Sequence, residues 1–169
     1  IGGGIKMLNK KIKVTIITIT ILTIIVAYCI LMPPKVLTRE NNKGNEYKQL
    51  DRLMNTTRYA EQVRKAGYEV DDYDLKMMDR IPKLETKGET KFEILSPADL
   101  KNIHVYTYTS GYSIHIIFDK NMKIRGGVID QGDDKPYREL TEEEKSKYEK
   151  EIKQEINKLL DDVYKAGEE

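Results

Sequence analysis

The sequence predicts an α+β protein, in which an N-terminal transmembrane helix precedes a small domain with an antiparallel β-meander of about 4–5 strands flanked by an N-terminal and a long C-terminal helix. Three observations predict this. Residues 14–32 form a run of 19 residues without a charge. Later segments rich in β-branched and aromatic residues alternate with turn residues, which is typical of an antiparallel sheet. Before and after these segments, apolar residues recur at helical spacing.

The uncharged run 14–32 has the length of a membrane anchor, because an α-helix of 19 residues rises about 28 Å, close to the thickness of a bilayer core. Its threonines, such as Thr18 and Thr23, can donate to the carbonyl one turn earlier. We therefore expect an uncleaved single-pass anchor at the cell membrane.

Three alternatives to an uncleaved anchor remain open. A secretory signal with its core at 14–25 would be cut after Ala27. A lipoprotein signal would carry lipid on Cys29, although Tyr28 is large for the residue before that cysteine and an apolar run continues after it. The third alternative is a buried helix of a soluble protein, and core helices are rarely apolar on every face.

The residues before the anchor suggest its orientation. Residues 1–6 precede Met7, and we interpret them as a translated ribosome-binding site of a bacterial gene. Lysines make residues 1–13 basic, so the positive-inside rule favours a cytoplasmic N-terminus and a C-terminal part outside the cell.

The remainder of the chain has the composition of one soluble domain. All 28 acidic residues lie beyond residue 32, together with 25 of the 29 basic residues. With acidic and basic residues nearly equal in number, this part of the chain lacks the strongly basic surface that nucleic-acid binding requires. Nucleic acid is therefore not an expected partner. Cys29 is the only cysteine, which excludes disulfides within the chain.

After the anchor, the sequence predicts a stalk at 33–44 and a domain at 45–169. Pro33 and Pro34 end the anchor, and a polar stretch follows. Asn45 is a suitable N-cap for a helix over 46–66, with Gly67 just beyond its end. The acidic stretch 71–79 lacks the spacing of a calcium loop, so we expect a short capped helix there.

The meander is predicted from five segments: 83–86, 91–95, 103–109, 112–118 and 124–130. Residues 96–99 suggest a single helical turn between the second and third. Gly126 and Gly127 suggest a bulge or bend in the last strand. Residues 130–137 read as a loop, and a capping box of Thr141 and Glu144 opens a helix that extends to about Ala166.

The candidate binding site lies on the central hairpin. If Ser110 and Gly111 form a two-residue turn, one face of the hairpin is apolar and meets the helices. The other face carries the two histidines about 7–8 Å apart, next to tyrosines. The predicted binding face consists of His104, Tyr106, Tyr108, Ser113, His115 and Ile117.

Catalytic, cofactor and metal sites are not expected. The only cysteine lies in the anchor, neither histidine has a recognisable serine or carboxylate partner motif, and a transition metal requires at least a third good ligand. No glycine-rich phosphate motif is present.

These observations favour a non-enzymatic, membrane-anchored bacterial module that binds a protein or peptide outside the cytoplasm. One alternative is an immunity or secretion-accessory protein that acts through its transmembrane helix, and another is a metal-binding or hydrolytic surface enzyme. The order of helix, meander and helix loosely resembles small cystatin-like and PepSY-like ectodomains. This resemblance concerns the fold and implies no function.

Overall fold

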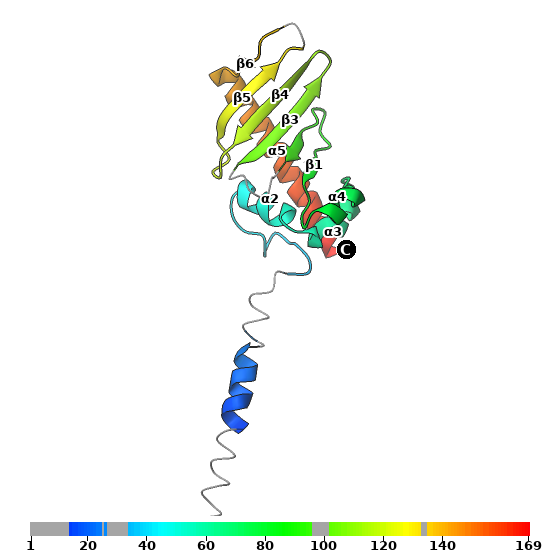
Figure 1. Ribbon diagram of the computed structural model, residues 1–169, viewed down its shortest axis with the longest axis vertical. Helices are drawn as coiled ribbons and strands as arrows, with labels where there is room; N and C mark the ends of the chain where they lie inside the picture. The colour runs from blue at the N-terminus through cyan, green and yellow to red at the C-terminus, as the bar shows by residue number, and fades with distance from the viewer. Residues whose placement is uncertain (1–13, 25, 27–33, 96–101, 133–134) are drawn as a thin grey trace, which may run out of the picture. The chain divides into compact units, whose positions relative to one another are not determined.

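The computed structural model describes residues 14–24, 26, 34–95, 102–132 and 135–169 (Figure 1). The chain divides into two compact units, Ile1–Pro34 and Lys35–Glu169, which we describe separately. The turn predicted at 96–99 lies outside the described residues.

In the first unit, residues 14–24 are helical. Thr18, Thr20 and Thr23 each donate their hydroxyl to the carbonyl four residues earlier, at 2.8–2.9 Å, as the sequence predicts. Within the described residues, no helix has both the length and the apolar character that a membrane span requires. The predicted anchor also includes residue 25 and residues 27–32, which lie outside the described part of the chain.

The second unit is an α+β domain whose sheet is an antiparallel meander in the order β1-β2-β3-β4-β5-β6. The strands are β1 (Lys83–Glu85), β2 (Glu93–Leu95), β3 (Ile103–Thr109), β4 (Tyr112–Phe118), β5 (Ile124–Asp130) and β6 (Arg138–Glu139). The bounds of β3, β4 and β5 agree with the prediction, whereas the expected 4–5 strands are corrected to six. The additional strand, β6, has two residues, too few to show an alternating pattern.

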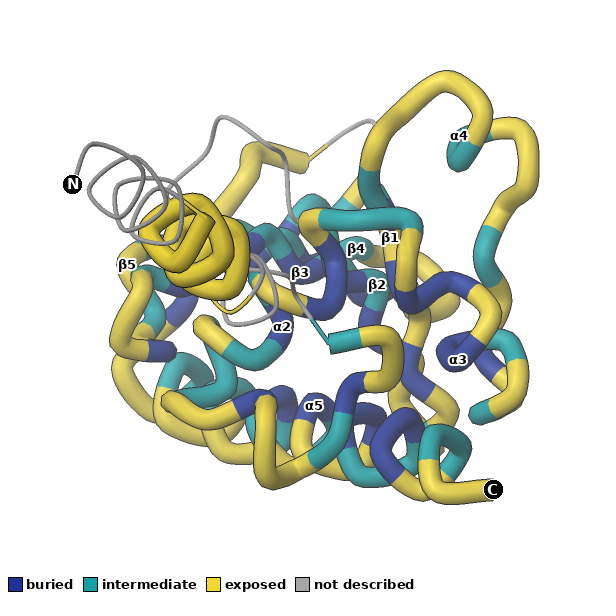
Figure 2. The backbone as a smooth tube through the Cα atoms, turned by 90° about the horizontal axis from the view of Figure 1, so that it is seen from below, coloured by how far each residue is buried: buried dark blue, intermediate teal, exposed yellow. Residues whose placement is uncertain are grey.

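One face of the sheet is covered by the helix α5 (Glu142–Glu168), which runs behind β3–β5 in Figure 1. The capping box of Thr141 and Glu144 is present at its start. The helices α2 (Glu46–Met54) and α3 (Ala60–Lys65) pack on α5. Figure 2 shows the buried backbone positions of these helices and of the strands gathered between the layers. Ile114, Ile116 and Phe118 of β4 are at most 1% exposed there, which confirms the face predicted to be apolar.

The single helix expected over 46–66 is corrected to three pieces: α2, the 3₁₀ turn η1 (Thr57–Tyr59) and α3. The break occurs where the backbone bonds to a later segment of the chain. Thr57 donates its N–H to the carbonyl of Asp79, and Ile81 donates to the carbonyl of Met54. The Thr56 hydroxyl accepts a hydrogen bond from the N–H of Arg58 and so caps the start of η1. Asp71 caps the short helix α4 (Asp72–Met77), as expected.

The stalk expected at 33–44 is corrected for residues 35–44, which pack on the domain. Leu37 is fully buried, and its N–H and carbonyl bond to the side-chain amide of Gln62 at 2.9 and 2.7 Å. Asn42 is 1% exposed and donates to the hydroxyl of Tyr164 at 2.9 Å. The polar residues 35–44 therefore belong to the domain, because their buried members, Leu37 and Asn42, bond to side chains distant in sequence.

Candidate functional site

The strand register brings the predicted binding face together. Tyr106 is opposite His115, His104 is opposite Ile117, and Tyr108 is opposite Ser113, all as the two-residue turn predicts. Gly111 has a φ of 104°, which only glycine adopts without strain in that turn. The side chains of β3 and β4 that alternate with the buried ones lie on the opposite side of the sheet from α5. We call this side the outer face.

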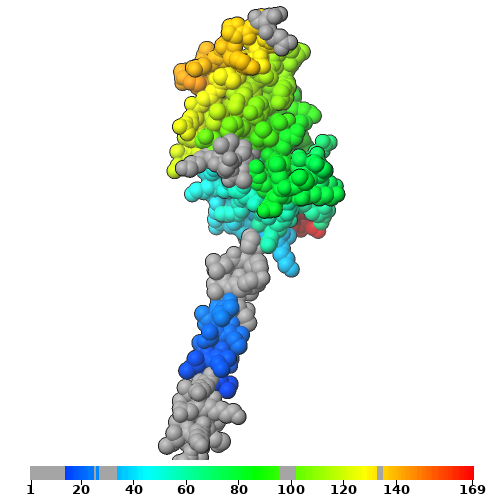
Figure 3. Space-filling view, viewed as in Figure 1, coloured from blue at the N-terminus to red at the C-terminus, as the bar shows by residue number. Residues whose placement is uncertain are grey.

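The outer face extends beyond the predicted hairpin. Leu95 of β2 is opposite His104, and Val128 of β5 is opposite His115. Both are only half-buried, so apolar surface continues across four strands. In Figure 3, the yellow to green atoms of β3–β5 form much of the surface turned toward the viewer. The sequence analysis missed these two residues, because they join the face only through pairing between separate segments.

The two histidines contact each other directly. The Nδ1 atom of His104 and the Nε2 atom of His115 are 2.9 Å apart, and the two ring planes are inclined to each other by 25°. The ring centres are 5.1 Å apart, close to this nitrogen separation plus one ring radius at each end. The nitrogens therefore point at each other, which is the geometry of an N–H···N hydrogen bond.

This geometry bears on metal binding. A zinc ion held by both rings would stand about 2.0–2.1 Å from each nitrogen, with both lone pairs directed at it. Here one nitrogen must carry a proton and the other must accept it. Among the described residues, no group of three or more histidine, cysteine, aspartate or glutamate side chains is placed to hold a metal ion.

The His115 ring also stacks on Tyr106. The ring centres are 4.3 Å apart and the planes are inclined by 1°, an offset stack across the two strands. Burial lowers the pKa of His104. Burial, followed by the charge of His104, also lowers the pKa of His115. Burial therefore favours the neutral form of both imidazoles, and the cluster presents flat rings with polar edges.

Among the hollows on the described surface of the domain, one lies beside α3 and another lies beside the histidine cluster. The larger, about 580 Å³, lies between α3, α4 and β1. Its Arg64 already pairs with Asp72, and the hydroxyl of Tyr68 donates to Asp162 at 2.9 Å. The smaller, about 280 Å³, is lined by His115 and Ile117 together with residues of β5, and it therefore continues the outer face.

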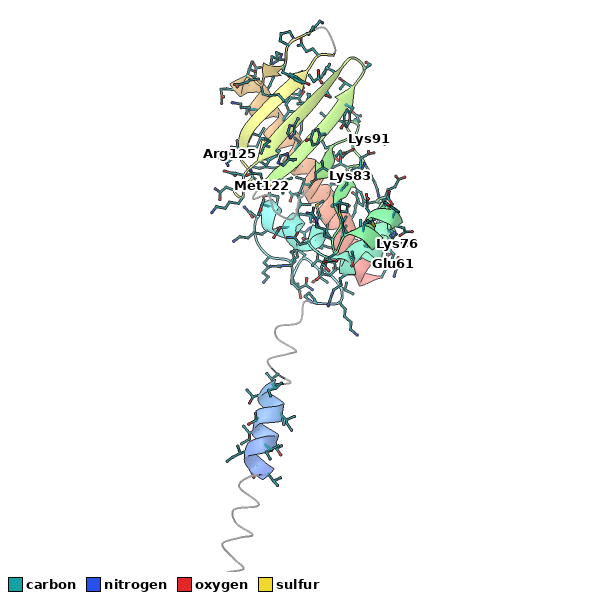
Figure 4. All side chains as sticks on the ribbon, viewed as in Figure 1. Glu61, Lys76, Lys83, Lys91, Met122 and Arg125 are labelled. Atoms are coloured by element: carbon teal, nitrogen blue, oxygen red, sulfur yellow. The ribbon has the colours of Figure 1, made fainter. Side chains whose placement is uncertain are left out.

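The chemistry of the outer face follows from the groups that it exposes. It combines stacked aromatic rings, half-buried aliphatic side chains and one proton donor or acceptor edge, and these are the groups found where proteins contact peptides. Figure 4 shows the side chains of β3–β5 on this side, with no helix drawn over them. Searches with known protein families, curated proteins and solved structures find no match to this chain.

Proposed function

We propose that this chain is a non-enzymatic, single-pass membrane protein of a bacterium, which binds a protein or peptide outside the cytoplasm through the outer face. The observation that carries the proposal is the open outer face itself. A six-stranded sheet packs one side on α5, and its other side carries stacked aromatic rings and aliphatic side chains that no described helix of the domain itself covers.

The membrane part of the proposal rests on the apolar run 14–32. Its described portion is helical, and the hydroxyls of Thr18, Thr20 and Thr23 are satisfied within the helix. This removes much of the cost of placing threonine in lipid, where each unpaired polar group costs several kcal/mol. Protease treatment of intact cells would cleave the domain, and finding the full chain free in the cytosol would refute the placement.

A capture experiment with two matched tyrosines tests the binding part. Tyr108 lies on the outer face and is 66% exposed, whereas Tyr73 lies on α4, away from the sheet strands, and is 68% exposed. Removing either ring costs little stability, because neither is buried. The full chain is tagged, crosslinked in its native membrane and purified with its partners.

The proposal predicts that Tyr108→Ala reduces capture of a specific partner at least fivefold and that Tyr73→Ala leaves it unchanged. Equal capture by both variants would refute the outer face as the binding site. Replacing residues 14–32 with an unrelated anchor should preserve capture. Loss of capture on that exchange would favour a protein that acts through its transmembrane helix.

A further inference from the structure

The smaller hollow lies where β5 adjoins the histidine cluster. Ile117 and Val128 contribute half-buried aliphatic side chains to it, and Gly126 lies opposite Ile117 in the strand register. Its volume, about 280 Å³, is at the lower end of the range for small-ligand pockets and suits one side chain of a bound peptide.

Gly126 has no structural reason to be glycine. A Cβ atom placed there meets nothing within 4 Å, and its backbone is not in the left-handed region. A glycine inside a strand costs about 0.5–1 kcal/mol relative to alanine. The neighbouring Gly127 differs, because a Cβ there would lie 2.4 Å from Cδ1 of the buried Leu140.

The β-bulge does not account for Gly126 either. The register shifts between Ile117 and Phe118, which pair with Gly126 and Ile124, so Arg125 is the extra residue. A glycine inside a strand that neither packing nor backbone geometry requires is typical of a place where a ligand or another backbone approaches closely.

The charged side chains around the hollow indicate which charge a ligand bound there would carry. Arg125 is exposed, and no ion pair or hydrogen bond to it is found within the described part of the chain, although its charge reaches Asp119. Lys145 also lines the hollow but already binds Glu142 at 2.7 Å. Glu139 on β6 adds one carboxylate to the rim and disfavours a ligand with several acidic groups.

We propose that this hollow binds an apolar side chain of a peptide over Gly126, with one adjacent carboxylate of the peptide paired to Arg125. This inference rests on the proposed function and specifies the chemistry of its ligand. The aliphatic side chains of Ile117 and Val128 surround the apolar group, and the neutral ring of His115 offers a polar edge to the peptide backbone.

The test uses the full chain, labelled with ¹⁵N and held in detergent micelles, and two peptides that differ in one charge. Acetyl-Leu-Asp-amide and acetyl-Leu-Asn-amide are titrated while the amide signals of Gly126 and Val128 are followed by NMR. Saturable shifts are expected at these amides, with the asparagine peptide about threefold weaker, the effect of one exposed ion pair.

Two variants complete the test. Gly126→Val fills the hollow without a clash and suits a strand, so it should keep or raise the thermal midpoint while abolishing the shifts. Arg125→Gln should remove the preference for the aspartate peptide. No saturable shift at Gly126, equal affinity for both peptides, or unchanged binding by Gly126→Val would each overturn the inference.

The two proposals can fail separately. If capture of the native partner depends on Tyr108 but is unchanged by Gly126→Val, the hollow is not part of the site and the binding face stands. If capture is independent of Tyr108, the proposed function itself fails.

Discussion

Gln62 connects three parts of the domain that are far apart in sequence. Its amide accepts a hydrogen bond from the N–H of Leu37 at 2.9 Å and donates to the carbonyls of Leu37 and Val163, each at 2.7 Å. Gln62 is 8% exposed, so water does not easily replace these bonds. Truncation by Gln62→Ala would leave the buried groups of Leu37 without a partner.

The size of the loss follows from these groups. An orphaned buried donor or acceptor costs about 1–3 kcal/mol, so two of them give about 2–6 kcal/mol. Detachment of residues 35–44 would cost less than leaving these groups buried and unpaired. The principal apolar loss is then the burial of Leu37, about 1.5–3 kcal/mol. We therefore expect a loss of about 3 kcal/mol in the free energy of unfolding.

Urea unfolding of the full chain in detergent, followed by circular dichroism, measures this loss. Hydrogen exchange should show earlier opening of residues 35–44 than of the sheet. Gln154→Ala, an exposed position on α5, is the control and should change stability by less than about 0.5 kcal/mol. A loss below about 1 kcal/mol for Gln62→Ala would refute the view that this amide fastens the N-terminal segment to the domain.

Two further predictions concern pH. The hydrogen bond from Arg138, followed by that from the Thr141 backbone, lowers the pKa of Glu144 to about 2. The stability it contributes is present above the ordinary value of 4.5 and is lost as the pH falls toward about 2. Glu144→Gln should therefore weaken the dependence of the thermal midpoint on pH across that range. An unchanged dependence on pH would contradict the role of Glu144 in the cap. The lowered pKa values of His104 and His115 mean that stability is lost as the pH falls below 6.5. His104→Asn should raise the pKa of His115, as followed by NMR of its ring, whereas a lower value would contradict the contact between the two rings.

Much of the sheet could be predicted from the sequence, because its determinants are local. The turn at Ser110 and Gly111 sets the register of β3 and β4, and the alternation along each strand then assigns both faces. The capping box at Thr141 likewise depends only on residues close in sequence.

The features that sequence reasoning missed depend on contacts between distant segments. Residues 35–44 read as a stalk because their attachment depends on Gln62 and Tyr164, which no local pattern connects to them. The helix break near Thr56 depends in the same way on residues 79 and 81. The bulge or bend predicted from Gly126 and Gly127 is confirmed as a register shift beside Gly126, but the hollow over that glycine was missed, because only pairing with Ile117 places it on the outer face.

The contact made by the outer face can be measured directly by photocrosslinking in native membranes. A benzoylphenylalanine is introduced at Tyr108 on the outer face or at Lys150, an exposed position on α5. If the outer face binds the partner, position 108 yields a discrete adduct and position 150 yields none. Equal adducts from both positions, or none from position 108, would contradict binding by the outer face.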